Sequence, residues 1–547
     1  MILSLLVVFS RVHSQSINLQ DVLNEHADDV TDIELQGESY FARELPLLNR
    51  NLTFFNKKMI NVTLDVSGCD VAAFSLEHSS LTLQSLSIKL SSEAAFATAK
   101  QDSILNLIFC NLGAANFTFP LLLGTNSQLI LKSARLEVTS MFSSFIEGPA
   151  DTIDPHLSLV VDQIYFWFQT IEAQKPLLAG PEVQNVTVSN CSFNEIHCEE
   201  DGPLPTEAVK GVANRSVVIK SSFIHHVDAA LSGVLVYGMQ ASYLTLEDVR
   251  YYTGTNAVRF SKNVAFSDSI EVRIDSSIIL TQNATTFWPN GGFLYLPHDK
   301  VHINMSHTEI RSSHAPNGNG GAIFTMGRST ITIDNCEFQR VSAGKSGGFM
   351  YAGKNLDTVT LNALTVSNST ASENGGFLYA NSVKSFQVND NTFSACHASK
   401  QGGVIFFQES DDSTINFSNV TFKENKADSN MGQDVLVSYK SASKYNVKKK
   451  NFGNCTSSTK GHKVTLLPKV RHAEWTDTVG QKVKSIIAGV VVGVCVFVAA
   501  CIALICVCCC CGCCVACGCG RKKADAYQHV ESQPISNSAP PQQYQIQ

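Results

Sequence analysis

Two acidic clusters carry the side chains best suited to catalysis. Glu199–Asp201 form one, and Glu409 with Asp411 and Asp412 forms the other. Converging carboxylates serve glycoside hydrolysis, and carboxylates around Ca²⁺ with a Lys or Arg base serve polysaccharide lyases. Both runs are typical of solvated turns. The NTD, GHG and RIK elements of polygalacturonases and the Ca²⁺-binding GGxGxD nonapeptide are not found in the sequence, so we predict no catalytic residue.

His225 and His226 suggest metal binding. Adjacent side chains on a strand point to opposite faces, so we expect these imidazoles not to share an ion. Of eighteen cysteines, seven precede a long apolar segment near the C-terminus, and Cys191 with Cys198 is the only sequence-close pair among them. No CxxC with histidine partners occurs in that part of the chain, so we predict neither a metal nor a cofactor.

Twelve Asn-x-Ser/Thr sequons are predicted N-glycosylation sites. They are Asn51, Asn61, Asn116, Asn185, Asn190, Asn214, Asn283, Asn304, Asn368, Asn416, Asn419 and Asn454.

The elements that position these residues are built from a sequence repeat, which consists of two short motifs. A double glycine followed by apolar residues recurs from Gly291, Gly320, Gly347, Gly375 and Gly402, at steps of 29, 27, 28 and 27 residues. The second motif places apolar residues at a start position and at plus two, plus five and plus seven, as in Ile331-Thr-Ile-Asp-Asn-Cys-Glu-Phe. A fixed period near 28 residues is typical of stacked structural units.

The second motif recurs over most of the chain. Its starts are Leu52, Leu81, Leu105, Leu129, Leu159, Val186, Ser216, Leu244, Val272, Val301, Ile331, Val359, Phe386, Ile415 and Tyr445, of which Ser216, Val301 and Tyr445 match imperfectly.

Period-two alternation indicates short strands, and no segment between them suits the helix of a βαβ unit. We therefore predict an all-β fold, a right-handed parallel β-helix of about 15 rungs (a pectin-lyase-like solenoid), with one C-terminal transmembrane helix. A β-propeller or an immunoglobulin array is disfavoured, because their repeats are roughly 40 and 100 residues long.

The repeat assigns side chains to faces. The plus-seven column predicts an internal aromatic ladder of Phe166, Phe193, Phe223, Tyr251, Phe338, Phe393, Phe422 and Phe452. Cys110, Cys191 and Cys336 lie in the plus-five column, where we expect them to be small apolar filler rather than disulfide partners. No sequon asparagine occupies an inward position, so every sequon is expected to face solvent.

The termini indicate a membrane protein. Residues 1–14 are typical of a secretory signal peptide, although a buried first strand is the alternative. The uncharged run Ile486–Val507 is long enough for a bilayer, and Arg521-Lys522-Lys523 behind it predicts a single-pass type I plasma-membrane protein. The expected parts are the β-helical ectodomain at 15–459 (GG rungs 291–437), a stalk at 460–484, the membrane helix at 485–511, and a cysteine-rich membrane edge with a disordered tail at 512–547.

Motifs near the membrane predict modification and sorting. Juxtamembrane cysteines are candidates for palmitoylation, with extension of the apolar helix or metal binding as the alternatives: Cys506, Cys508, Cys509, Cys510, Cys511, Cys513 and Cys514. Tyr527 and Val530 fit the pattern that endocytic adaptors bind. The alternative is that this part of the tail is only a spacer. Gly489-x-x-x-Gly493 is compatible with self-association.

Net charge is -7 without long basic runs in the ectodomain, so no nucleic-acid partner is predicted.

Gly320-Gly321-Ala322-Ile323 and Phe422-Lys423-Glu424-Asn425 resemble the GGAI and FxxN repeats of the polymorphic outer membrane proteins of bacterial autotransporters. A C-terminal helix in place of their β-barrel resembles the related repeat proteins of parasitic protists. This resemblance implies non-enzymatic adhesion to a protein or glycan on host or neighbouring cells. The alternatives are a membrane-anchored polysaccharide lyase or glycoside hydrolase and, less favoured because the tail is short, a signalling receptor.

Overall fold

A computed structural model describes the chain at residues 16–26, 31–36, 39–57, 62–69, 71–90, 95–113, 121–123, 126–137, 140–141, 146–147, 157–171, 178, 183–198, 215–227, 241–255, 258–259, 269–284, 289–297, 300–353, 356–439, 451–461, 463–467 and 471–473. The chain divides into two compact units, Met1–Asp477 and Thr478–Gln547. Every described residue belongs to the first unit.

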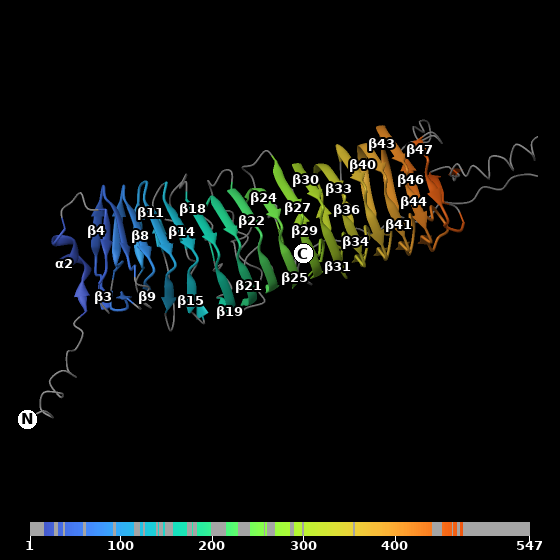
Figure 1. Ribbon diagram of the computed structural model, residues 1–547. Coiled ribbons are helices and arrows are strands. Elements are labelled where there is room, and N and C mark those ends of the chain that lie inside the picture. Colours follow the sequence, from blue (N-terminus) through green and yellow to red (C-terminus); the bar gives the residue numbers. More distant parts are fainter. Residues whose placement is uncertain are drawn as a thin grey trace, which may run out of the picture. The chain divides into compact units, whose positions relative to one another are not determined.

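Three ladders of parallel strands build this unit, and they follow the sequence in order from blue to orange in Figure 1. The strands of the first ladder contain the apolar residues at the start and plus-two positions of the repeat. Its members are β2 (Asp32–Glu34), β5 (Asn51–Phe55), β8 (Ser80–Gln84), β11 (Ile104–Ile108), β14 (Gln128–Lys132), β18 (Ser158–Asp162), β20 (Asn185–Ser189), β22 (Arg215–Lys220), β24 (Ala241–Glu247), β27 (Ile270–Asp275), β30 (Lys300–Ser306), β33 (Arg328–Asp334), β37 (Thr358–Asn362), β40 (Leu378–Asn389), β43 (Ile405–Ser418) and β47 (Phe452–Gly453).

The second ladder follows the first bend of each turn. It contains β1 (Ile17–Asn18), β3 (Ser39–Phe41), β6 (Thr63–Asp65), β9 (Ser87–Lys89), β12 (Asn111–Gly113), β15 (Arg135–Glu137), β16 (Ser140–Met141), β19 (Tyr165–Ile171), β21 (Ser192–Cys198), β23 (Phe223–Val227), β25 (Arg250–Thr255), β28 (Ile278–Asn283), β31 (Glu309–Ala315), β34 (Glu337–Gln339), β35 (Ser342–Ala343), β38 (Thr365–Ser367), β39 (Thr370–Ala371), β41 (Thr392–Ser394), β42 (His397–Ala398), β44 (Thr421–Lys423), β45 (Lys426–Ala427) and β48 (Thr456–Ser457).

The third ladder is described in two stretches. One holds β4 (Leu45–Leu48), β7 (Phe74–Glu77), β10 (Ala97–Lys100), β13 (Leu121–Leu123) and β17 (Ile146–Glu147), and the other holds β26 (Val258–Arg259), β29 (Leu294–Leu296), β32 (Ile323–Thr325), β36 (Met350–Ala352), the first halves of β40 and β43, β46 (Val435–Tyr439) and β49 (Val464–Leu467). The described residues therefore confirm an all-β parallel solenoid.

The predicted membrane helix at 485–511 lies outside the described residues, as do the signal peptide, the juxtamembrane cysteines and the Tyr527 motif. No helix within the described part of the chain is long and apolar enough to cross a bilayer.

Strand register confirms most predicted starts, for example Leu81 beside Leu105 and Leu129, and corrects three. Val186 pairs with Val217, so the start is not Ser216. Val272 pairs with Ile303, so the start there is not Val301. Phe417, at plus two of its turn, pairs with Phe452, so the last turn does not start at Tyr445. Each error occurs where apolar residues are adjacent or two apart, because such runs fit more than one register.

The predicted internal aromatic ladder forms only in pieces. Phe166 stacks on Phe193 with ring centroids 4.8 Å apart, and Phe393 stacks on Phe422 at 5.5 Å. Phe452 belongs to a different column, since it stacks on Phe417. A longer ladder follows the double glycines and comprises Tyr295, Phe324, Tyr351, Tyr379 and Phe406, with adjacent centroids 4.8 to 5.3 Å apart.

The double glycines are required by close backbone contact. Gly320 adopts a positive φ of 66°, which costs an L-residue free energy that glycine avoids. A Cβ at Gly348 would lie 2.0 Å from the carbonyl oxygen of Gly376. The column ends at Gly432-Gln433, where the buried Gln433 side chain instead bonds to both backbone groups of Ala427.

Elements other than parallel strands lie at both ends of the solenoid. A short helix, α2 (Leu19–Asn24), packs Leu19 and Leu23 against the core at the N-terminal end. At the other end β49 continues the third ladder by pairing with β46, although the sequence assigned residues 460–484 to a stalk. β50 (Arg471–Ala473) then pairs antiparallel with β49.

Gly348→Ala is expected to destabilise the solenoid, because the new methyl group meets backbone atoms that cannot move aside. We expect a loss of at least about 2 kcal/mol. Gly113→Ala is the matched control, since nothing lies within 4 Å of its Cβ position. Urea unfolding of a secreted Gln15–Lys484 fragment measures both, and equal midpoints for the two variants would contradict the packing argument.

The inward cysteines are buried thiols, as predicted for Cys110, Cys191 and Cys336. Burial raises the pKa of each to about 11 and that of Cys396 to about 12. The folded state therefore holds these protons more tightly than the unfolded chain does. Stability is constant below the unfolded thiol pKa of about 8.5 and falls as pH rises toward 11.

Two measurements test this behaviour. The folded ectodomain at pH 8 should react with a thiol reagent far more slowly than the urea-unfolded chain. Its unfolding midpoint should drop between pH 9 and 11, and a variant with these four cysteines replaced by alanine should lose most of that drop. Rapid labelling of the folded protein at pH 8 would show that the thiols are accessible.

Candidate binding site on the second strand ladder

The acidic clusters singled out in the sequence do not form a described site. Glu199–Asp201 lie outside the described residues. Asp411 and Asp412 belong to β43 rather than to the predicted loop, at a point where its register against β40 shifts. Residues 410–413 of β43 there oppose one residue of β40, Lys384, which is the pattern of a bulge.

The expectation that His225 and His226 face opposite ways is wrong. Their ring centroids lie 4.0 Å apart, because His226 adopts a left-handed backbone with φ 51° that interrupts strand alternation. Nδ1 of His225 lies 2.8 Å from Oδ1 of Asn194. Partial burial, and secondarily the neighbouring His226, lower the pKa of His225. Within the described residues no three His, Cys, Asp or Glu side chains converge as metal ligands.

Both histidines border a column of outward side chains on the second ladder. Register places Arg135 beside Tyr165, Tyr165 beside Ser192, Ser192 beside Phe223, and Phe223 beside Arg250, on β15, β19, β21, β23 and β25. Tyr165 is 73% exposed and Phe223 is 37% exposed. Large exposed rings are unusual on a surface whose remaining outward positions are mostly polar, so this column is the candidate site.

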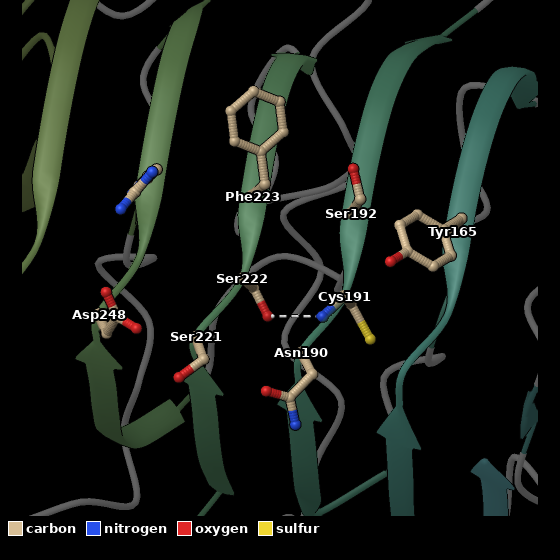
Figure 2. Close-up of a pocket in the computed structure, with 9 residues that line it drawn as sticks. Tyr165, Asn190, Cys191, Ser192, Ser221, Ser222, Phe223 and Asp248 are labelled. Atoms are coloured by element: carbon tan, nitrogen blue, oxygen red, sulfur yellow. Dashed lines mark hydrogen bonds between the residues drawn. The ribbon is translucent and has the colours of Figure 1, made fainter. Parts of the chain in front are cut away.

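A cavity of about 350 Å³ opens at this column. It is lined by Tyr165, Asn190, Cys191, Ser192, Ser221, Ser222, Phe223, Asp248 and Arg250. Figure 2 shows the rings of Tyr165 and Phe223 on the two sides of Ser192. The small Ser192 side chain leaves the space between the rings unfilled.

The polar groups of this cavity gather at the first bend. Ser222 is buried, and its Oγ accepts a hydrogen bond of 3.2 Å from the backbone amide of Cys191. Nδ2 of Asn190 donates to Oδ1 of Asp162 at 2.9 Å. Asp248 and Arg250 are exposed at the rim. Asp248 is the only carboxylate among the lining residues, so this cavity does not supply the carboxylate pair of a glycosidase.

Further rings extend the site along the ladder. The Phe223 ring lies 5.3 Å from that of Tyr252 and 5.9 Å from that of His225, measured between centroids. Aromatic pairs at such distances stabilise one another and give a rigid apolar surface.

Sequence reasoning missed this site because it assigned Phe223 to the interior. The slipped start at Ser216 placed Phe223 at plus seven, whereas the true start, Val217, places the buried Ile224 there. The signal was present, since Val217, Ile219 and Ile224 fit the apolar template better than Ser216, Val218 and Phe223 do.

The described sequons border this face, and one of them, Asn190, lines the cavity. Asn61, Asn116 and Asn214 lie outside the described residues. All nine described sequon asparagines are exposed, as expected: Asn51, Asn185, Asn190, Asn283, Asn304, Asn368, Asn416, Asn419 and Asn454. The turns bend at plus four, and those from Val186 to Ile415 bend again at plus nine, where residues such as Asn190 and Asn368 have positive φ. None of the nine lies between these bends, the segment that carries Tyr165 and Phe223.

Comparison with known proteins gives no relative: no family model matches the chain, and neither a curated protein nor a solved structure matches it.

Phe193→Ala should lower the free energy of unfolding more than Phe223→Ala does. This difference tests the register that defines the site. Phe193 is 0% exposed and stacks on Phe166, so its truncation should cost about 3–5 kcal/mol. The exposed Phe223 should cost about 1 kcal/mol or less. Chemical denaturation measures the unfolding free energy of both variants. A larger loss for Phe223→Ala would show that Phe223 is the buried residue and that this register is wrong.

Proposed function

We propose that the chain is a single-pass type I plasma-membrane glycoprotein whose solenoid ectodomain adheres, without catalysis, to a protein or glycan on host or neighbouring cells. The described solenoid supports an extended display surface, because stacked turns repeat similar outward positions along one direction. The signal peptide at 1–14, the membrane helix at 485–511, the right-handed winding and about 15 rungs are parts of the same proposal. The repeat resemblance supports them.

One observation carries the adhesive role. The segment between the two bends holds the exposed Tyr165 and Phe223, while the described sequons lie on the bends and on the other faces. Glycans at the described sequons other than Asn190 would lie outside this strip and leave it accessible, whereas Asn190 lies at the edge of its cavity. Aromatic side chains are favoured anchors of binding interfaces, because they bury a large area at low conformational cost.

The membrane-proximal motifs support display and turnover. Palmitoylation of the cysteines from Cys506 to Cys514 would strengthen attachment at the inner membrane edge. Tyr527 and Val530 would bind an endocytic adaptor as an extended peptide, and the GxxxG from Gly489 would allow two copies to associate through their helices.

Adhesion is tested with the full chain displayed on a non-adherent cell line. We expect saturable attachment to host or sister cells, competed by soluble Gln15–Lys484. Tyr165→Ala with Phe223→Ala should reduce attachment at least about 5-fold, if these side chains are binding hot spots. Tyr243→Ala is the matched control, since Tyr243 is 45% exposed on β24 of the first ladder.

Attachment that does not saturate, or that the double variant leaves intact, would contradict the proposal. Release of reducing ends from a polysaccharide panel, lost on changing Asp411 and Asp412 to Asn, would replace adhesion with carbohydrate-active catalysis.

A further inference from the structure

We propose that the cavity between Tyr165 and Phe223 binds a single pyranose ring of a neutral glycan. This inference rests on the proposed adhesive function, for which it names the ligand class.

The first argument is size. Tyr165 and Phe223 lie in the same column two strands apart, with Ser192 on the strand between them. Neighbouring strands are ~4.8 Å apart, so the two backbones are separated by ~9.6 Å. The cavity volume of about 350 Å³ is compatible with one sugar and part of its neighbour.

The second argument is chemistry. The sides of the cavity are aromatic, whereas the hydroxyls of Ser192 and Ser221 and the charged groups of Asp248 and Arg250 lie around them. A pyranose combines an apolar C–H face with hydroxyls around its edge, so one molecule meets both kinds of surface. A purely apolar ligand would desolvate Asp248 and Arg250 without replacing their hydrogen bonds to water.

The third argument is charge. Asp248 and Arg250 are two residues apart on the same turn and have opposite signs. A carboxylate accepts hydrogen bonds and a guanidinium donates them, and sugar hydroxyls serve both. The lining residues carry one negative and one positive charge, so they give a sulfated or uronic sugar no net attraction. The site therefore suits a neutral sugar.

Asn190 supplies an internal competitor. It is a sequon asparagine whose side chain lines the same cavity. A glycan attached there starts at the rim, so the chain's own sugar is the other occupant to be tested. Asn190→Gln removes this attachment and leaves Tyr165, Ser192 and Phe223 unchanged.

The full chain, purified in mild detergent, is titrated by saturation-transfer NMR with glucose, galactose, mannose and N-acetylglucosamine, and with a sulfated disaccharide. We expect at least one neutral sugar to bind with a dissociation constant near ~1 mM, which is typical of a small contact. Tyr165→Ala and Phe223→Ala should each weaken binding about 10-fold, the effect of losing ~1.4 kcal/mol. Tyr243→Ala should bind as the parent does, and circular dichroism should confirm folding.

Three results would overturn the inference: no binding of any neutral sugar, preference for the sulfated disaccharide, or binding that appears only in Asn190→Gln. If the Tyr165→Ala/Phe223→Ala double variant abolishes cell attachment while no sugar binds, adhesion stands and the ligand class is wrong. If sugar binds but cells do not attach, the cavity is a glycan site and the adhesive function is wrong.

Discussion

The solenoid depends on left-handed residues at its bends. Positive φ recurs at plus four in the described turns from Leu81 onward, and at plus nine in the turns from Val186 to Ile415, as at Asn335 (φ 49°) and Arg340 (φ 52°) of one turn. Most of these residues are not glycine, and an L-residue there costs roughly 1–2 kcal/mol. The bends persist because their backbone groups are bonded to the next turn, as when the amide of Asn335 donates to the carbonyl of Asn362 at 3.0 Å.

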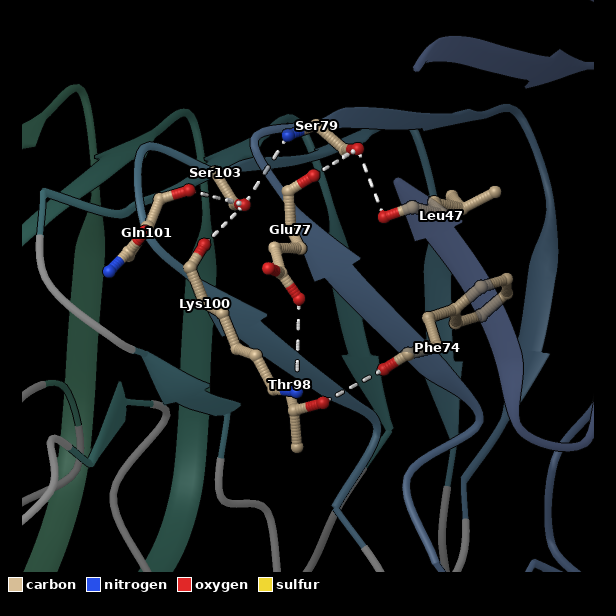
Figure 3. Close-up of polar contacts among 8 residues, drawn as sticks. All are labelled: Leu47, Phe74, Glu77, Ser79, Thr98, Lys100, Gln101 and Ser103. Carbon is tan, nitrogen blue, oxygen red and sulfur yellow. Dashed lines mark hydrogen bonds and ion pairs between the residues drawn. The ribbon is translucent and has the colours of Figure 1, made fainter. Parts of the chain in front are cut away.

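Side chains complete the bonding at the corners. At plus five, Ser277 Oγ accepts from the Val249 amide at 3.1 Å. At the corner before the first ladder, the Ser79 amide donates to Ser103 Oγ at 3.4 Å, and Ser79 Oγ lies 3.0 Å from the carbonyl oxygen of Leu47 (Figure 3). A buried amide without a partner would cost about 1–3 kcal/mol. Small polar residues and cysteines at these inward positions are therefore part of the fold.

The same bends decide which side chains are exposed. A left-handed residue interrupts alternation, so two consecutive side chains face outward at each corner, which is why His225 and His226 lie together. The sequence was sufficient to predict an all-β parallel solenoid, because a stacked column repeats its apolar signal many times. At Ser216 the run Val217, Val218 and Ile219 partly satisfies either face, and the predicted register followed the weaker match. One slipped residue moved Phe223 from the surface to the interior in the prediction and hid the site.

The aromatic columns show why the site lies where it does. Along the double glycines, Tyr351 stacks on Tyr379 at 4.8 Å with planes 4° apart, so each ring covers the face of the next and no ligand enters. On the second ladder, Ser192 interrupts the column between Tyr165 and Phe223. The stacking that stabilises the solenoid elsewhere is absent between these two rings, and the surfaces that would have met are available to a ligand. The small Ser192 between two exposed rings thus leaves aromatic surface uncovered, whereas the double-glycine column covers it ring by ring.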